Sequence, residues 1–336
     1  MSDSYVVNLD SVGLEDVAEV GGKNASSGEM LRALSGMGIR VPGGFATTAA
    51  AYRRFLDSAQ LVQPIQAAID AYYRGETLLA ETGSAIRGLI LETDLPSELS
   101  NGVLEAYRLL GEQGGSADPA VAVRSSATAE DLPGASFAGQ QETFLNVHGE
   151  RALLDACRRC YASLFTDRAI SYRDAKGFGH LDVALSIGVQ RMVRSDKAGS
   201  GVMFTLDPET GFPNAIVISA AWGLGETVVQ GTVDPDKYTV FKPLLADPRN
   251  APIIEKSVGS KAVKLTYARG GSRRTRLVDT TRAERERFVL SDPEILQLSR
   301  WAVAVEAHYG RPMDLEWAKD GETGELFLVQ ARPETV

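Results

Sequence analysis

The sequence predicts an α+β protein built from two lobes, and three observations lead to this fold class. The chain has 336 residues, which at roughly 150 residues per domain corresponds to about two domains, each able to bury its own core. Helical patterns dominate the first hundred residues. Short strand patterns recur after Arg191. We therefore place the lobe boundary near 190–200, with residues 1–190 in the first lobe and 191–336 in the second.

Composition and charge narrow the class of protein. Hydrophobic residues make up 44% of the chain and charged residues 24%, which is ordinary for a soluble globular protein. No stretch approaches the roughly 20 apolar residues of a membrane span, and the first ten residues lack a signal-peptide pattern, so we expect no membrane partner. Two cysteines cannot build a disulfide framework, which predicts a cytoplasmic protein. The 35 basic and 44 acidic residues give a net charge of −9, which argues against a nucleic-acid partner.

Periodicity predicts the elements of the first lobe. Apolar residues at helical spacing indicate three helices, the second of which has Thr47 or Thr48 as its cap. Residues 183–189 alternate between apolar and small or polar types, which is typical of a half-buried strand. In chain order we expect helices over 24–34 and 49–56, a strand over 121–124, a helix over 153–172 and a strand over 183–189.

The second lobe is expected to be richer in strands. Its helix follows Ser291 or Asp292 as a cap, and the stretches 244–252 and 269–274 read as surface loops. In chain order we expect strands over 201–205, 216–220, 238–241 and 263–267, a helix over 293–309, and strands over 313–318 and 326–332.

The last twenty residues carry the sharpest chemical pattern. Residues two apart in a strand share a face, so Asp314 and Glu316 point the same way, as do Gln330 and Arg332. The connecting residues 319–325 are rich in turn formers, so the two strands can pair as a hairpin. If the polar faces coincide, the oxygen ligands suit Mg²⁺ and the guanidinium suits a phosphate. The alternative is an ordinary alternating face turned to solvent.

A glycine-rich turn near the N-terminus is a second candidate. Gly21 and Gly22 would let the backbone approach a phosphate, and Lys23 would supply a positive charge at a helix start. Ser26 and Glu29 have the spacing of a capping box, which places that start nearby. The spacing is not that of a P-loop, and a plain loop-to-helix junction is the alternative.

Two further stretches have the character of ligand-binding turns. Arg124 ends a strand pattern and is followed by hydroxyls and a small-residue loop running to Gln141, as a phosphate cover would need. An ordinary surface loop with one exposed Arg explains the same residues. Gly223 and Gly225 precede Glu226 in a sharp turn into a helix, but a dinucleotide fingerprint would need a third glycine.

Several reactive residue types are expected to be structural. Cys157 and Cys160 have zinc-like spacing but lie inside a helical pattern without a second ligand pair. His148, His180 and His308 lie outside any glycine-rich nucleophile turn.

Six segments, taken in order, closely resemble the phosphoenolpyruvate synthase family. The resemblance covers nearly the whole chain, although individual motifs are shared with pyruvate phosphate dikinase and rifampin phosphotransferase. One departure is Ser27, where the family usually has Leu. The segments are Gly-Gly-Lys-Asn-Ala-Ser (21–26), Val-Arg-Ser-Ser-Ala-Thr-Ala-Glu-Asp (123–131), Ala-Ser-Phe-Ala-Gly-Gln-Gln-Glu-Thr-Phe-Leu-Asn-Val (135–147), Trp-Gly-Leu-Gly-Glu (222–226), Tyr-Gly-Arg-Pro-Met-Asp-Leu-Glu-Trp-Ala (309–318) and Val-Gln-Ala-Arg-Pro-Glu-Thr-Val (329–336).

The resemblance implies an ATP-grasp fold of the pyruvate phosphate dikinase N-terminal type, in which two α+β lobes clasp ATP. It implies that the catalytic cations handling phosphate are Lys23, Arg124 and Arg332.

The remaining ligand roles also come from the resemblance. It implies that Glu316 and Gln330 bind Mg²⁺, with Asp314 beside them, and that Gly139 and Thr143 lie on a loop covering the phosphates.

Three more positions are implied around the nucleoside. Gln190 and Met192 fall where a strand meets adenine, and Glu226 faces the ribose or a second metal.

In the family a domain with the phosphate-accepting histidine and a pyruvate-binding barrel follow this region. Neither has room after Val336, so we expect an excised or truncated nucleotide domain that orients ATP but cannot complete transfer alone. Three alternatives stay open: the matching domain of a rifampin phosphotransferase, a stand-alone nucleotide-binding module without chemistry, and a degenerate fold that no longer binds nucleotide.

Overall fold

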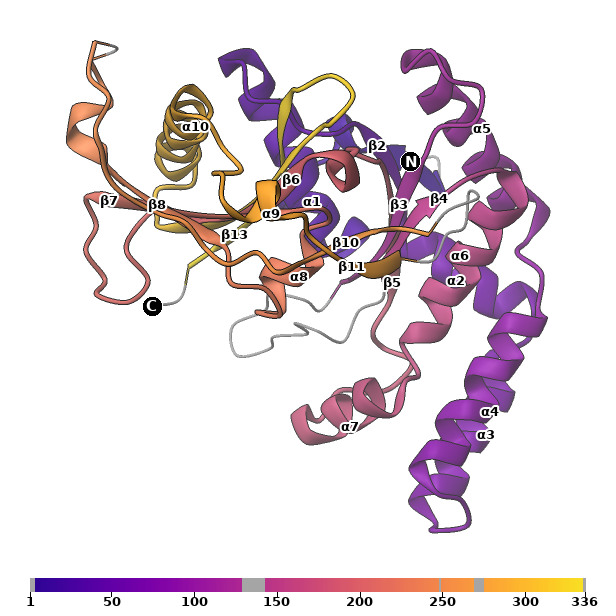
Figure 1. Cartoon of the computed structure of the whole chain (residues 1–336). Helices are drawn as coiled ribbons and strands as arrows, with labels where there is room; N and C mark the ends of the chain where they lie inside the picture. The colour runs from indigo at the N-terminus through magenta and orange to yellow at the C-terminus, as the bar shows by residue number, and fades with distance from the viewer. Residues whose placement is uncertain (1–3, 129–142, 248, 269–274, 335–336) are drawn as a thin grey trace. The chain divides into compact units, whose positions relative to one another are not determined.

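The computed structural model describes residues 4–128, 143–247, 249–268 and 275–334. Helices and antiparallel sheets fill these ranges, which confirms the α+β class (Figure 1). The chain divides into two compact units. The first unit comprises Met1–Arg32 and Gly43–Met192, and the second comprises Ala33–Pro42 and Val193–Val336. In the described ranges, no helix combines the length and apolar character that a membrane crossing requires.

The first unit contains a five-stranded antiparallel sheet. Its strand order is β1-β2-β5-β3-β4. The strands are β1 (Val6–Asn8), β2 (Gly44–Thr47), β3 (Val121–Ala127), β4 (Thr143–Val147) and β5 (Leu185–Arg191). The helices are α1 (Val17–Leu34), α2 (Ala49–Ser58), α3 (Val62–Tyr73), α4 (Leu79–Glu92), α5 (Ser97–Gln113), α6 (Glu150–Ser163) and α7 (Asp167–Lys176).

Both faces of this sheet are covered. Val123 of β3 and Ile187 of β5 join the large apolar core that α2, α5 and α6 complete. The alternate residues turn to α1, where Asn24 Nδ2 donates to Ser186 Oγ at 2.8 Å. The prediction that this strand is half-buried is therefore wrong, because Ser186 and Gln190 on this second face are buried as well.

The predicted helix over 153–172 is two helices. The chain leaves α6 after Ser163 and re-enters a helix at Asp167. Thr166 caps α7, since its side chain accepts a hydrogen bond from the Ala169 N–H. Buried Phe165 continues the apolar pattern across the break, which explains why periodicity alone joins the two helices.

The second unit is built on a six-stranded antiparallel sheet with the order β13-β12-β6-β7-β8-β9. A two-stranded sheet, β10-β11, accompanies it. The strands are β6 (Gly199–Phe204), β7 (Ala215–Trp222), β8 (Asp236–Phe241), β9 (Ile253–Ser257), β10 (Val263–Tyr267), β11 (Thr275–Asp279), β12 (Met313–Lys319) and β13 (Leu326–Pro333). The helices are α8 (Glu226–Val229), α9 (Arg282–Arg285) and α10 (Asp292–Tyr309), the last beginning after Ser291 as expected.

One face of the six-stranded sheet packs against α10. Leu315 and Trp317 of β12 are buried on this side, and Lys319 pairs with Glu294 of α10 at 2.5 Å. Alternation along β12 therefore turns Asp314 and Glu316 to the opposite face.

Residues 33–42 belong to the second unit although they lie early in the chain. The Leu328 N–H of β13 donates to the Arg40 carbonyl at 2.9 Å, and Arg40 Nε lies 3.1 Å from Glu325 Oε1. The sequence-based division at residue 190 assigns this segment to the first lobe because the pairing joins positions far apart in the sequence.

Candidate functional site

The C-terminal hairpin sets the four polar residues predicted from the sequence into two facing pairs. In the register of β12 and β13, Asp314 lies opposite Arg332 and Glu316 lies opposite Gln330. Residues directly opposite in an antiparallel pair share one face. The hairpin therefore places two carboxylates, an amide and a guanidinium on one patch of the second unit.

Asp314 and Arg332 form an ion pair of unequal exposure. Arg332 Nε and Nη2 each lie 2.7 Å from Asp314 Oδ2, and the side chains are 50% and 8% exposed, respectively. Burial raises the pKa of Asp314, while the charge of Arg332 opposes the shift. Burial would lower the pKa of Arg332, but the negative charge of Asp314 raises it on balance. The guanidinium thus holds one carboxylate oxygen and leaves part of itself open to solvent.

The second oxygen of this carboxylate is the one acceptor of the ion pair that a cation could still satisfy. Asp314 Oδ1 is buried and has no hydrogen-bond partner. A buried acceptor left unsatisfied costs about 1–3 kcal/mol, and a cation would satisfy it. In the described part of the chain, no cluster of three or more His, Cys, Asp or Glu side chains is arranged to hold a metal ion. The donors at hand are Asp314, Glu316 and Gln330, which fits Mg²⁺ because this ion takes one or two carboxylates together with phosphate oxygens.

In the first unit, Gly21 interrupts α1 just before Lys23. Its backbone angles are φ 75° and ψ 161°, in the region that favours glycine. A Cβ at this position would overlap Ser126 Oγ and the Ser126 carbonyl. The Asn24 N–H donates to Ser126 Oγ at 3.4 Å, as expected of an N–H at a helical start. The glycine therefore lets the helix carrying Lys23 approach β3 directly.

α1 runs from Val17, but the break at Gly21 divides it, and its second part begins just after Gly21, close to the helix expected over 24–34. Ser26 and Glu29 lie inside this second part and not at its first residue. Glu29 instead pairs with Arg32 at 3.0 Å, one turn further along.

Arg124 lies on the face of the sheet that α1 covers. It is two residues from Ser126 on β3, and its partners across the sheet are Thr143 on β4 and Gly188 on β5. Gln190 is two residues beyond Gly188 and shares this face.

The first unit therefore gathers three of the sequence-predicted positions, Arg124, Thr143 and Gln190, on one face of its sheet. Lys23 lies on α1, the helix that packs against this face. Met192 follows β5, where its N–H donates to the Ala120 carbonyl at 3.0 Å. Gly139 lies outside the described residues.

Glu226 opens α8 and is exposed. The preceding turn is the sharp one expected: Gly223 has φ 87° and pairs with Leu265 as an isolated bridge. Ser200 Oγ donates to the Gly223 carbonyl at 2.7 Å. Ser200 is two residues from Val202, which lies opposite Glu316, so the turn before Glu226 meets the face of the sheet that carries Glu316.

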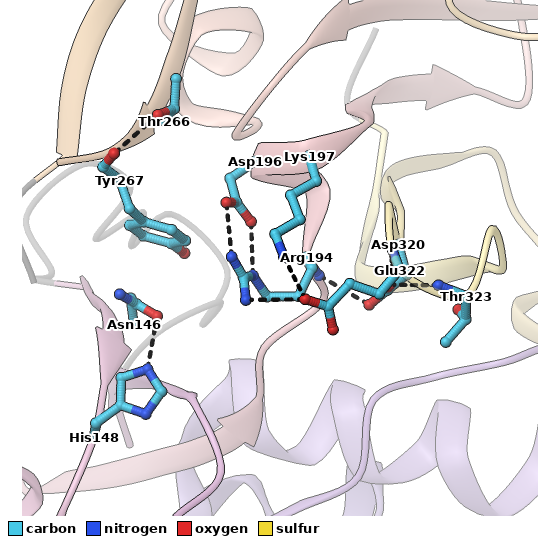
Figure 2. A network of polar contacts seen from close by, with 10 residues as sticks. All are labelled: Asn146, His148, Arg194, Asp196, Lys197, Thr266, Tyr267, Asp320, Glu322 and Thr323. Carbon is cyan, nitrogen blue, oxygen red and sulfur yellow. Dashed lines mark hydrogen bonds and ion pairs between the residues drawn. The ribbon is translucent and has the colours of Figure 1, made fainter. Parts of the chain in front are cut away.

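Sequence reasoning missed a polar network at the tip of the hairpin (Figure 2). The Arg194 N–H donates to Asp320 Oδ2 at 3.0 Å, and Lys197 Nζ lies 2.6 Å from Glu322 Oε1. By pattern, Glu322 reads as a solvated turn residue. The available signal is Asp320 itself, whose Oδ1 accepts from the N–H groups of Glu322 and Thr323 in an Asx turn.

The cysteines and histidines take structural places. Cys157 and Cys160 are buried in α6 and form no disulfide, and burial raises the pKa of the Cys157 thiol to about 12. His148 Nε2 lies 3.0 Å from Asn146 Oδ1 (Figure 2). His180 is buried between Arg173 and Asp174.

Comparisons with known proteins agree with the motifs. A family model described as "Pyruvate phosphate dikinase, AMP/ATP-binding domain" matches residues 17–336. The chain is 55% identical over 344 residues to phosphoenolpyruvate synthase of Synechocystis sp., covering 99% of this chain and 42% of that protein. It is 52% identical over 338 residues to phosphoenolpyruvate synthase of Escherichia coli, covering 100% and 42%. A probable phosphoenolpyruvate synthase of Methanocaldococcus jannaschii is 42% identical, with 99% and 27% covered. The resemblance seen in the motifs is confirmed, and the chain spans less than half the length of these relatives.

Proposed function

The chain belongs to the pyruvate phosphate dikinase AMP/ATP-binding domain family, and we propose that it is the ATP-binding part of a phosphoenolpyruvate synthase, a pyruvate, water dikinase. In that reaction ATP, pyruvate and water give phosphoenolpyruvate, AMP and phosphate. The observation that carries the proposal is the register of the hairpin, which sets Asp314 opposite Arg332 and Glu316 opposite Gln330. The relatives described above are named phosphoenolpyruvate synthase, which favours this reading over an antibiotic phosphotransferase.

The second unit supplies the metal-binding and one phosphate-binding part of the function. Glu316, Gln330 and Asp314 hold Mg²⁺, and the orphaned Oδ1 of Asp314 supports this assignment. Bound Mg²⁺ would neutralise charge on the ATP phosphates. Arg332 contacts a phosphate with the part of its guanidinium that the ion pair with Asp314 leaves exposed.

The first unit supplies the remaining phosphate contacts. Lys23 follows the helix break at Gly21, and Arg124 lies on the sheet face against which that helix packs. Positive charge on this face offsets the net negative charge of the chain and positions a polyphosphate. Thr143 borders the predicted phosphate-covering loop, to which Gly139 belongs.

The nucleoside contacts are assigned with the same logic. We assign Gln190 and Met192 to adenine. The burial of Gln190 on the Arg124 face and the position of Met192 just after β5 support this assignment. Glu226, exposed at the first residue of α8, faces the ribose or a second metal.

The partners of this part are a phosphohistidine domain and a pyruvate-binding domain of the full enzyme. Its own share is to orient ATP and stabilise developing charge, and the acceptor histidine lies on the partner domain. We place the enzyme in the cytoplasm, and the two buried cysteines, which form no disulfide, support this location.

The proposal is tested by a ³¹P NMR time course on this chain with ATP, Mg²⁺ and pyruvate. We expect the ATP resonances to broaden or shift without accumulation of AMP or phosphoenolpyruvate. Unperturbed ATP resonances would contradict the binding function. Formation of phosphoenolpyruvate would show that the chain completes the transfer by itself, and one of His148, His180 and His308 would then be a candidate acceptor.

A further inference from the structure

The chain enters the second unit twice, at Ala33 and at Val193. Both entering segments form hydrogen bonds with the β12–β13 hairpin. Residues 33–42 reach β13 through the hydrogen bond from the Leu328 N–H to the Arg40 carbonyl, at 2.9 Å. Arg40 also pairs with Glu325 at the start of this strand. The later entry, at Val193, runs directly to Arg194 and the turn that joins β12 to β13. The hairpin that carries the polar patch is therefore attached to both entering segments, once through β13 and once through its turn.

Asp320 makes the second attachment. Its Oδ2 accepts from the Arg194 N–H at 3.0 Å, and the Gly321 N–H donates back to the Arg194 carbonyl at 3.1 Å. Its Oδ1 accepts from the N–H groups of Glu322 and Thr323 at 2.8 and 3.0 Å (Figure 2). The residue is 9% exposed. Burial would raise the pKa of Asp320, but the backbone donors lower it on balance, so the carboxylate is ionised and its three hydrogen bonds hold near neutral pH.

Charged side chains lie around the contact between Asp320 and the Arg194 backbone, but none of them makes the same hydrogen bonds. Asp196 holds the Arg194 guanidinium with two hydrogen bonds of 2.8 and 2.9 Å. Glu322 lies 2.6 Å from Lys197 Nζ but is half exposed, and exposed ion pairs contribute little. Gly321 packs on the backbone of Lys197 with no room for a Cβ. The turn therefore sits tightly on residues 194–197, and the buried carboxylate of Asp320 provides the directional bonds.

We propose that Asp320 is a positioning residue for the metal- and phosphate-binding face of the hairpin. By fixing the turn on the segment that enters the second unit, it holds β12 so that Glu316 keeps its alignment with Gln330. Ligand groups must be held to within about 0.5 Å to act together, and Glu316 is four residues from Asp320 along β12. This inference rests on the proposed function, since it assigns Asp320 a part in Mg²⁺-dependent ATP binding.

The test compares Asp320→Asn with Glu322→Gln, a matched loss of charge in the same turn. ATP affinity of each variant and of the wild type is measured by calorimetry, once with Mg²⁺ and once in EDTA. We expect Asp320→Asn to lower the Mg²⁺-supported affinity by about 10- to 100-fold, the usual loss when a group supporting metal ligands is removed. Its affinity in EDTA and both affinities of Glu322→Gln should stay within about twofold of the wild type.

The ratio of ATP affinity with Mg²⁺ to ATP affinity in EDTA distinguishes a positioning role of Asp320 from a merely structural one. A merely structural role would weaken ATP binding equally with and without Mg²⁺, and that result would overturn the inference, as would a wild-type ratio in Asp320→Asn. Should Asp320→Asn fail to fold, Gly321→Ala decides the matter, because its Cβ pushes the turn away from Lys197 while Asp320 stays in place. The ratio of ATP affinity with Mg²⁺ to ATP affinity in EDTA must then be lower in Gly321→Ala than in the wild type. A wild-type chain that does not bind ATP, or binds it without any Mg²⁺ effect, would instead contradict the proposed function.

Discussion

The two polar faces of this protein are built by opposite means. On the α1 face of the first unit, neutral groups are buried and bonded to one another: Asn24 to Ser186, and Ser186 in turn to the Thr47 carbonyl at 2.5 Å. On the hairpin of the second unit, Arg332 is half exposed, and the buried carboxylate of Asp314 keeps one oxygen without a partner.

This difference predicts how each face responds to change. The α1 face depends on close packing of small residues, so added volume should damage it most. The hairpin depends on the balance of two charges, so removing one charge should damage it most. Two substitutions, taken in order of decreasing effect, separate these two responses, and a smaller pH effect elsewhere in the first unit follows them.

Gly21→Ala should have the largest effect on stability. The backbone at this position has φ 75°, and a Cβ would overlap Ser126. Backbone strain in this nearly glycine-only region costs about 1–3 kcal/mol and overpacking about 1–3 kcal/mol, so we expect a loss of about 2–6 kcal/mol in the free energy of unfolding. Denaturation should be followed by far-UV circular dichroism, because Trp222, Trp301 and Trp317 all lie in the second unit.

Gly75→Ala is the matched control for steric overlap. Gly75 has φ 74° in the same unit, with nothing within 4 Å of a Cβ. It should lose the strain cost alone, about 1–2 kcal/mol. Equal losses in the two variants would show that contact with Ser126 does not matter.

Arg332→Ala should have an intermediate effect on stability and a strong effect on ATP binding. The sequence alone predicts a larger effect on phosphate handling than on stability, since the strand position is polar. The structure adds a cost in stability, because the substitution leaves Asp314 buried without its ion-pair partner. We expect a loss of about 1–2 kcal/mol, moderated by the exposure of Arg332.

A second variant tests the cause of that loss. Adding Asp314→Asn to Arg332→Ala removes the unpaired charge, so most of the stability should return in urea denaturation while MgATP binding stays weak. A double variant as unstable as Arg332→Ala alone would count against the ion pair as the cause.

The smallest effect is expected from protonation of His180 in the first unit. Its Nδ1 accepts from Arg173 Nε at 3.1 Å, and Nε2 lies 3.0 Å from Asp174 and 2.9 Å from the Tyr73 hydroxyl. Burial and then the charge of Arg173 lower the pKa of His180 below 6.5. The unfolded chain therefore binds the proton more tightly, and stability should fall as the pH drops through about 6.5 and below.

His180→Gln isolates this contribution, since an amide can accept from Arg173 and donate to Asp174 without titrating. The free energy of unfolding should fall less between pH 7.5 and 5.5 in the variant than in the wild type. Identical pH dependence in the two proteins would exclude His180 as the source. Asp314 should act in the opposite direction near pH 4, because burial raises its pKa and the folded state then binds the proton more tightly.

The sequence predicts the structure of the hairpin better than that of the α1 face. The hairpin follows from local information, because period-two alternation and a turn-rich link predict both the strands and the coincidence of their polar faces. The α1 face depends on contacts between distant positions: Asn24 meets Ser186, which is 162 residues away. A single sequence carries no signal for such a partner.

The same reasoning explains the misread elements. Gly21 and Gly22 indicate a loop in the sequence, yet Gly21 lies at a kink within α1. Glycine is needed there because a Cβ would overlap Ser126, a residue that only the folded chain brings close. The hydrogen bond from the Arg194 N–H to Asp320 joins residues 126 positions apart, so the sequence pattern could not predict it either. Thr166 did carry a readable capping signal at the start of α7, but the apolar periodicity over 153–172 outweighed it.

The most direct test of the account is an equilibrium titration of the chain with MgATP and with AMP, repeated on Lys23→Ala and Arg332→Ala. Each substitution removes one phosphate-handling cation, and a charge-assisted hydrogen bond contributes about 1.5–3 kcal/mol, which is about 10- to 150-fold in affinity. The account predicts that both variants lose MgATP affinity by about this factor, while AMP, which lacks the β- and γ-phosphates, binds within about threefold of the wild type. Wild-type MgATP affinity in either variant would contradict the claim that each unit carries part of the phosphate-binding machinery.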